Sequence, residues 1–262
     1  MTERLLIVFS YIRFLRGSLP EYAVVEGDTA FPLRGSDPSS FERTGEQLPL
    51  KELTLLCPCT PGKIIGVGLN YRDIQLKEGE SLPCEPKLFL KSPQAILPPG
   101  QPILRPAEVQ ELSCEVELAV VIGKKGRDIP ETEAMGYIWG YMTANDVTAS
   151  DIQRRDVLWG RAKNYDTFLP LSDRILAGTG PGPFRLRCIK NGSILIDSFT
   201  DRMICPVPRL IHYISHVMTL CPGDLILTGT PTGYGVPVAP GDVVEVAIEG
   251  IGSCRNPVNC SL

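Results

Sequence analysis

The chain has 262 residues, 43% of them hydrophobic and 21% charged, and its formal net charge is −4. This size and composition are typical of a soluble globular protein with a sizeable core, and they argue against a disordered chain. The acidic balance argues against nucleic acid or an anionic membrane as the main partner. No apolar run reaches the length of a membrane span.

The first part of the chain predicts short strands. Leu5–Ile12 reads as a first strand and not as a signal peptide, because it is short and a basic residue follows at once. Further strands are predicted at Tyr11–Phe14 and Tyr22–Val25, with turn residues between them. The polar stretch 34–40 has the composition of a loop, and a second block begins near residue 61.

The second block also consists mainly of predicted strands, at 63–68, 87–89, 115–122, 137–144, 186–190, 224–228 and 243–248. The clearest helix is Arg209–Met218, where apolar residues recur three and four positions apart. Regular alternation of strands and helices is absent. The predicted class is therefore α+β and predominantly β.

Nine cysteines are scattered along the chain, and Cys57 and Cys59 form the one close pair. Their spacing suits neither a zinc ribbon nor a redox motif. We therefore expect reduced, mostly structural thiols in a cytoplasmic protein.

The pattern most indicative of chemistry is a pair of glutamates followed by an aspartate. In the run 115–122, alternation places Glu115 and Glu117 on one face of a strand, about 7 Å apart. Two half-buried carboxylates repel each other unless a cation compensates, and Asp146 could complete an all-oxygen site for Mg²⁺, Mn²⁺ or Ca²⁺. The alternative for the two glutamates is a solvated strand face.

Six ordered segments resemble the fumarylacetoacetate hydrolase family over roughly residues 63 to 258. They are 66–73 (GVGLNYRD), 87–91 (KLFLK), 114–123 (CEVELAVVIG), 140–148 (GYMTANDVT), 162–170 (AKNYDTFLP) and 223–233 (GDLILTGTPTG), followed by 241–245 (GDVVE). The resemblance is to the group of 2-hydroxyhepta-2,4-diene-1,7-dioate isomerases, 5-carboxymethyl-2-oxo-hex-3-ene-1,7-dioate decarboxylases and acylpyruvate hydrolases.

The resemblance implies a mixed β-sandwich and β-roll catalytic domain over residues 61–262, commonly dimeric, after a small N-terminal β domain over residues 1–60. It implies Mg²⁺ or Mn²⁺ held by Glu115, Glu117 and Asp146. Members of the family act on small 2-oxo or β-diketo acids. A 2-oxo carboxylate would chelate the cation, which would stabilise the enolate shared by isomerisation, decarboxylation and C–C hydrolysis.

The resemblance also implies a set of substrate-facing residues. Lys163 is expected to pair with the substrate carboxylate or the enolate oxygen, and Gln153 to contact the substrate. Gly229 and Thr230 offer a backbone N–H and a hydroxyl suited to an anion. Arg72 is expected to help hold an anionic ligand, with a structural salt bridge as the alternative.

His212 and His216 are four residues apart on the predicted helix, a spacing that could suggest a metal pair. Apolar residues surround them, and this helix lies outside the family's site. We therefore expect packed or surface histidines.

Two departures from the family pattern bear on the reaction. The hydrolytic members carry a histidine and a glutamate that activate water, and here the corresponding positions hold Ile74 and Lys77. Glu78 is adjacent and could partly replace the missing glutamate as a catalytic group. Ser150 stands where many members have a substrate-contacting arginine.

Three functions follow from these observations. The first is a divalent-metal-dependent isomerase (tautomerase) or decarboxylase of the kind used in aromatic catabolism, acting on a small 2-oxo dicarboxylate or β-keto acid. The second is C–C hydrolysis of the acylpyruvate or fumarylacetoacetate type. The third is a protein that binds metal and oxo acid and has lost catalysis. We expect a homodimer with a small-molecule substrate and no nucleic-acid or membrane partner.

Overall fold

The computed structural model describes residues 8–35, 38–74, 83–180 and 182–261. It is predominantly β, with one twelve-stranded sheet and three smaller sheets, so the predicted α+β, mainly β class is confirmed. Among these residues no helix combines the length and the apolar character needed to span a bilayer. All nine cysteines carry free thiols.

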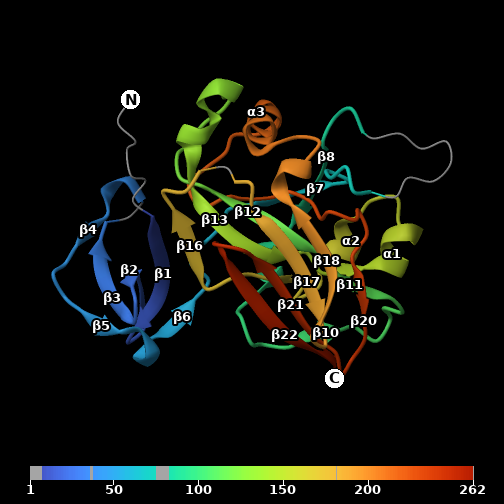
Figure 1. Cartoon of the computed structure of the whole chain (residues 1–262), viewed down its shortest axis with the longest axis horizontal. Coiled ribbons are helices and arrows are strands. Elements are labelled where there is room, and N and C mark those ends of the chain that lie inside the picture. The colour runs from blue at the N-terminus through green and yellow to red at the C-terminus, as the bar shows by residue number, and fades with distance from the viewer. Residues whose placement is uncertain (1–7, 36–37, 75–82, 181, 262) are drawn as a thin grey trace.

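The N-terminal strands form one end of the large sheet (Figure 1). They are β1 (Phe9–Arg16), β2 (Leu19–Glu26), β3 (Thr29–Arg34), β4 (Glu42–Arg43), β5 (Leu48–Pro49) and β6 (Thr54–Leu56). Their inner side chains make a small hydrophobic cluster around Ile12, Phe14 and Val25, separate from the main core. The predicted strands at 11–14 and 22–25 lie within β1 and β2, while residues 5–7 lie outside the described part. The domain boundary after residue 60 stays a prediction.

The same sheet continues through the strands of the second block. They are β7 (Ile64–Gly68), β8 (Lys87–Lys91), β12 (Val116–Ile122), β13 (Ile138–Asn145), β16 (Arg174–Ala177) and β19 (Leu225–Leu227). Their order from the N-terminal end is β1, β16, β13, β12, β19, β7 and β8. Every residue of β12 is buried, because this central strand is covered on both faces.

A five-stranded sheet packs across β12 and β13 and gives the molecule its sandwich (Figure 1). Its strands are β10 (Ile103–Arg105), β22 (Gly252–Cys260), β21 (Val243–Ile248), β17 (Arg185–Lys190) and β18 (Ser193–Phe199). The two smaller sheets consist of β14 (Thr148–Ala149), β11 (Leu112–Cys114) and β20 (Val236–Val238), and of β15 (Leu169–Pro170) and β9 (Ile96–Leu97).

The helices are α1 (Ser150–Arg155), α2 (Gly160–Lys163) and α3 (Val207–Val217), with 3₁₀ turns at Pro38–Ser40, Leu50–Glu52, Pro93–Ala95, Glu131–Tyr137 and Thr200–Arg202. The predicted helix 209–218 is α3. It begins two residues earlier because Pro208 suits the first turn, where its missing N–H costs nothing. The short helices α1 and α2 carry no sequence periodicity and were not expected.

One predicted strand is interrupted at a residue important for the site. The run 115–122 was expected to be continuous, but Glu115 lies in a break between β11 and β12. β11 pairs with β14 and β20, whereas β12 pairs with β13 and β19. The chain therefore changes sheets at Glu115, so the run that was expected to be one strand is two.

Candidate active site

The three predicted metal ligands meet at one end of β12 and β13. Val116 pairs with Asn145 in the antiparallel register, so the next positions along each strand, Glu115 and Asp146, are neighbours. A hydrogen bond from the Asp146 N–H to the Glu115 carbonyl oxygen, 2.9 Å long, fixes this contact. Ligand oxygens of Glu115, Glu117 and Asp146 all lie within 4.8 Å of one another. The structure thus brings together the three carboxylates that the sequence singled out.

These carboxylates are buried, with Glu115 7%, Glu117 2% and Asp146 0% exposed. The surrounding chain holds Glu115 in place. Its N–H donates to the Asn145 side-chain oxygen at 2.9 Å, and the Thr148 hydroxyl donates to its Oε1 at 2.9 Å. Such fixed acceptors cannot turn away from one another, so their mutual repulsion has to be relieved by positive charge.

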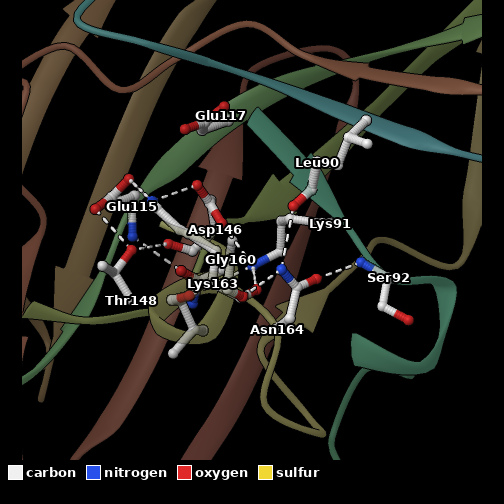
Figure 2. A network of polar contacts seen from close by, with 12 residues as sticks. Leu90, Lys91, Ser92, Glu115, Glu117, Asp146, Thr148, Gly160, Lys163 and Asn164 are labelled. Carbon is white, nitrogen blue, oxygen red and sulfur yellow. Dashed lines mark hydrogen bonds and ion pairs between the residues drawn. The ribbon is translucent and has the colours of Figure 1, made fainter. Parts of the chain in front are cut away.

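Lys163, at the end of α2, provides part of that charge (Figure 2). Its Nζ lies 3.0 Å from Glu115 Oε2 and 2.5 Å from Asp146 Oδ2, and the side chain is buried. It also lies 5.0 Å from the centroid of the Phe89 ring. The predicted substrate-facing lysine is therefore part of the acidic cluster itself.

A second buried lysine, Lys91 at the end of β8, was not singled out from the sequence. Its Nζ lies 2.7 Å from Asp146 Oδ1 and donates to the Lys163 carbonyl oxygen. Asn164 fastens α2 to β8 around it, donating to the Leu90 carbonyl at 3.1 Å and accepting from the Ser92 N–H (Figure 2). No local signal marks it, because Lys87 lies on the same face of β8 and is exposed.

The pKa shifts follow from burial and from the distribution of these charges. Burial, together with the charges of Asp146 and Glu115, raises the pKa of Glu117 well above its usual range. Burial also raises the pKa of Glu115, against the opposing effect of Lys163. Burial would do the same at Asp146, but Lys163 and Lys91 outweigh it and lower that pKa. Burial would lower the pKa of Lys163, but the carboxylates outweigh it and raise it.

Glu117 is the member of the cluster that lacks a counter-charge. Within the described part of the chain no lysine or arginine forms an ion pair with it, and its partner is the Gly229 N–H at 2.7 Å. A buried carboxylate without a cation is costly. Three buried oxygen donors with an uncompensated charge fit a hard divalent cation, so these residues could hold one.

Gly229 and Thr230 form the adjacent wall. Gly229 has φ +94°, and a Cβ there would lie 2.8 Å from the Val67 carbonyl oxygen; only glycine brings this N–H to Glu117. The Thr230 hydroxyl is buried and has no hydrogen-bond partner among the described residues. It lines a cavity of about 20 Å³ together with Glu115, Glu117 and Lys163. Their predicted roles in substrate binding stay predictions.

A larger cavity of about 440 Å³ adjoins the small one. Both are lined by Glu115 and by Gln153, which stands on α1. Ser150 also lines the larger cavity, and its Oγ lies 2.8 Å from Ser113 Oγ. The predicted substrate-contacting glutamine thus lies beside the acidic cluster.

The remaining predicted residues are placed differently. Arg72 is exposed, its N–H donates to the Arg202 carbonyl, and it does not line either cavity. Its role in anion binding stays a prediction. Lys77 and Glu78 lie outside the described residues, so the proposed catalytic role of Glu78 stays a prediction as well.

Ile74, which the resemblance places at the position of the family's histidine, is 9% exposed. It packs against Gly233, where a Cβ would lie 2.9 Å from Ile74 Cγ1, and Gly233 lines the small cavity. An apolar side chain therefore packs against the wall of the small cavity at this point. The histidines of α3 do not replace the family's histidine, because His212 contacts the Ile129 carbonyl and His216 the His212 carbonyl, each at 2.8 Å. Within the described ranges, the three carboxylates are the one cluster suited to a metal.

Comparisons with known proteins agree with this geometry. The family described as Fumarylacetoacetate (FAA) hydrolase C-terminal matches residues 63–259, and the family Rv2993c-like, N-terminal matches residues 10–58. The chain is 43% identical to Protein Rv2993c of Mycobacterium tuberculosis over 218 residues, which are 82% of each protein.

Two further matches carry functional names. Oxaloacetate tautomerase fahd2, mitochondrial, of Xenopus laevis is 39% identical over 232 residues, 84% of this chain and 73% of that protein. The crystal structure of a 5-carboxymethyl-2-hydroxymuconate delta-isomerase from Mycobacterium smegmatis superposes with a TM-score of 0.88 at 38% identity. The match covers 96% of this chain and all of that one.

Proposed function

The chain belongs to the fumarylacetoacetate hydrolase family, and we propose that it is a divalent-metal-dependent isomerase (tautomerase) of a small 2-oxo dicarboxylate or β-keto acid. The observation that carries the proposal is the buried cluster of Glu115, Glu117 and Asp146 with Lys163 between two of them. We infer Mg²⁺ as the cation, with Mn²⁺ or Ca²⁺ as substitutes, because all three donors are carboxylates.

The charge of the cluster supports this function. When all groups are ionised, the three carboxylates and the ammonium groups of Lys91 and Lys163 leave a formal charge of −1. A dication would change it to +1, which suits an oxo acid that becomes more negative as its enolate forms. A bound dication would supply electrostatic stabilisation of that enolate.

The chain's own residues would bind and orient the substrate. Lys163 Nζ faces the cavity from between Glu115 and Asp146, where it can donate to a carboxylate or to the enolate oxygen. The unpartnered Thr230 hydroxyl can donate to the same anion. Lys91 touches Asp146 but does not line the small cavity, so it would hold Asp146 in position and not contact substrate.

Ile74 favours isomerisation over hydrolysis. A keto–enol or double-bond shift needs an enolate and a proton transfer, whereas C–C hydrolysis also needs an activated water. Loss of a general base costs about 10²–10⁴ in rate, and an isoleucine cannot act as one. The names of the tautomerase and isomerase relatives point the same way. Decarboxylation, which needs no activated water either, is the nearest alternative.

Hydrolysis is a second candidate because Glu78 is adjacent to the position of the family's glutamate. With Lys163 and Glu78 as its catalytic groups, such an enzyme would cleave an acylpyruvate to two acids. Glu78→Gln would then abolish cleavage and leave enolisation of oxaloacetate intact.

The test is a substrate screen by NMR on Mg²⁺-loaded protein. The panel contains oxaloacetate, an acylpyruvate and 2-hydroxyhepta-2,4-dienedioate, with exchange of the C3 protons of oxaloacetate in D₂O as the readout of enolisation. Asp146→Asn should reduce the exchange rate to that of oxaloacetate with Mg²⁺ alone, whereas Glu249→Gln, which changes an exposed carboxylate near Arg187, should keep the wild-type rate. Tight oxalate binding without any turnover would instead indicate a protein that binds oxo acids and has lost catalysis.

We also infer, from the family resemblance, a cytoplasmic homodimer. Light scattering of the purified chain tests the oligomeric state, and a monomer that is fully active would contradict it.

A further inference from the structure

The larger cavity beside the acidic cluster is of the size of a ligand pocket. Its volume of about 440 Å³ falls in the range of pockets that hold small organic molecules. It shares Glu115 and Gln153 with the small cavity. A molecule whose 2-oxo acid end lies at the cluster therefore has room to extend along α1.

Helix α1 lines this cavity with three residues of one face. Ser150, Gln153 and Arg154 are three and four positions apart, which is the spacing of neighbours on a helix surface. The Ser150 hydroxyl is paired with Ser113 and carries no charge. Arg154 begins about 6 Å farther along the helix axis. Among the residues that line the cavity, it is the one lysine or arginine.

Arg154 forms an exposed ion pair with Glu111, which also lines the cavity. Its Nη2 lies 2.7 Å from Glu111 Oε1, and the two side chains are 60% and 59% exposed. Glu111 is fixed in turn, because its N–H and that of Gln110 donate to the Asp151 carboxylate at 3.3 and 3.2 Å. An exposed ion pair contributes little free energy, so a ligand carboxylate can take the place of Glu111 at small cost.

We propose that Arg154 determines specificity by binding the distal carboxylate of an extended 2-oxo dicarboxylate. This inference rests on the proposed function, which places the 2-oxo acid end at Glu115, Glu117 and Asp146. Arg154 lies about one helical turn along from Ser150, whose uncharged hydroxyl is already paired with Ser113. The length of the preferred substrate is then set by the span between the acidic cluster and the Arg154 guanidinium.

The test compares binding of matched ligands to the Mg²⁺-loaded protein by calorimetry. The ligands are oxalate, 2-oxohexanoate and the dicarboxylates 2-oxoglutarate, 2-oxoadipate and 2-oxopimelate. We expect the wild type to bind its best dicarboxylate about threefold to fivefold more tightly than 2-oxohexanoate, which is the range that an exposed ion pair to arginine gives. Arg154→Gln should abolish this preference and change the affinity for oxalate by less than about twofold.

Two variants sharpen the result. Arg155→Gln removes the neighbouring arginine, which does not line the cavity and lies 3.6 Å from Asp156; it should leave every affinity unchanged. Glu111→Gln should tighten dicarboxylate binding several-fold, because it removes a competing carboxylate.

The outcomes separate this inference from the proposed function. A wild type that binds oxalate but does not prefer any dicarboxylate over 2-oxohexanoate would overturn the role of Arg154, as would a preference that survives Arg154→Gln. Failure of oxalate and 2-oxohexanoate to bind at all would instead overturn the proposed function. Thermal melting of each variant confirms that the comparison is made between folded proteins.

Discussion

The N-terminal strands and the acidic cluster both place carboxylates beside basic side chains, but in opposite surroundings. Arg16 lies 3.1 Å from Glu21 and 2.9 Å from Glu46, and all three side chains are at least a third exposed. Lys163 and Asp146 are 2% and 0% exposed. Water screens the first set, so each pair is worth about 0–1 kcal/mol. The second set has lost its hydration, at several kcal/mol per ion.

This difference indicates that the buried cluster was not selected for stability. A core of the same volume filled with apolar residues would fold at least as well. Five ionisable groups with an excess of negative charge are instead what a cation and an anionic substrate require. The exposed pairs can be removed with little consequence, whereas each member of the buried set should have a distinct effect.

Removal of Lys163 should have the largest effect. Lys163→Met leaves Glu115 without a cationic partner and Asp146 with Lys91 alone, so the metal-free protein should lose about 3–5 kcal/mol of unfolding free energy. Turnover should fall by about 10² or more, because the donor to the enolate is gone. Denaturant unfolding with and without Mg²⁺ and the enolisation assay measure the two effects.

Lys124→Met is the control for that variant, since Lys124 is exposed and its Nζ lies 4.8 Å from the Tyr137 ring centroid, on another part of the surface. It should change stability by less than about 1 kcal/mol. If Lys163→Met and the wild type were equally stable without metal, Lys163 would not be needed to offset the repulsion between the buried carboxylates.

At a Mg²⁺ concentration of a hundred times the Kd, Mg²⁺ binding should raise the free energy of unfolding of the wild type by about 2.7 kcal/mol. Glu117→Gln should remove this gain. Without metal, the same variant should be at least as stable as wild type, because it removes a buried carboxylate that has no cationic partner. Melting curves in EDTA and in Mg²⁺ test both statements, and a metal-free Glu117→Gln protein that melts below wild type would refute the second.

Gly229→Ala should lower stability by about 1–3 kcal/mol and weaken Mg²⁺ binding. The new Cβ would meet the Val67 carbonyl at 2.8 Å, with φ at +94°, and relief of that contact would move the N–H away from Glu117. Gly241→Ala is the control, because Gly241 has nearly the same backbone conformation as Gly229, with φ +99°. A Cβ at Gly241 would have no atom within 4 Å. This substitution should cost about 1 kcal/mol and leave the metal affinity unchanged.

Arg16→Met should have the smallest effect, a loss of no more than about 1 kcal/mol that shrinks further in high salt. Catalysis should be unaffected. Melting at low and high ionic strength measures it. If Arg16→Met lost as much free energy of unfolding as Lys163→Met, the proposed difference between exposed and buried ion pairs would be wrong.

The central strands and the three carboxylates could be predicted from the sequence because local pattern encodes them. The run from Glu115 to Ile122 is mainly apolar, and its two glutamates, two positions apart, stand out within it. The antiparallel register then brings Asp146 to Glu115, which the order of the segments alone does not show. The family resemblance implied a substrate-facing role for Lys163, whereas its ion pairs with Glu115 and Asp146 are visible only in the structure.

Other features depend on long-range packing and could not be read locally. The break at Glu115 exists because β11 and β12 pair with different sheets. Lys91 is buried because α2 closes over the end of β8, and a lysine at a strand end is ordinarily exposed. The role of Arg154 depends on a cavity whose walls come from α1, β11 and β20.

The change of sheets at Glu115 also has a geometric consequence. On one side of this residue the chain belongs to the small sheet with β20, whose residues line the larger cavity, and on the other side it belongs to the central sheet. A ligand that binds the Glu115 carboxylate would therefore sit where the two sheets meet, in reach of the cavity wall and of the central strands alike.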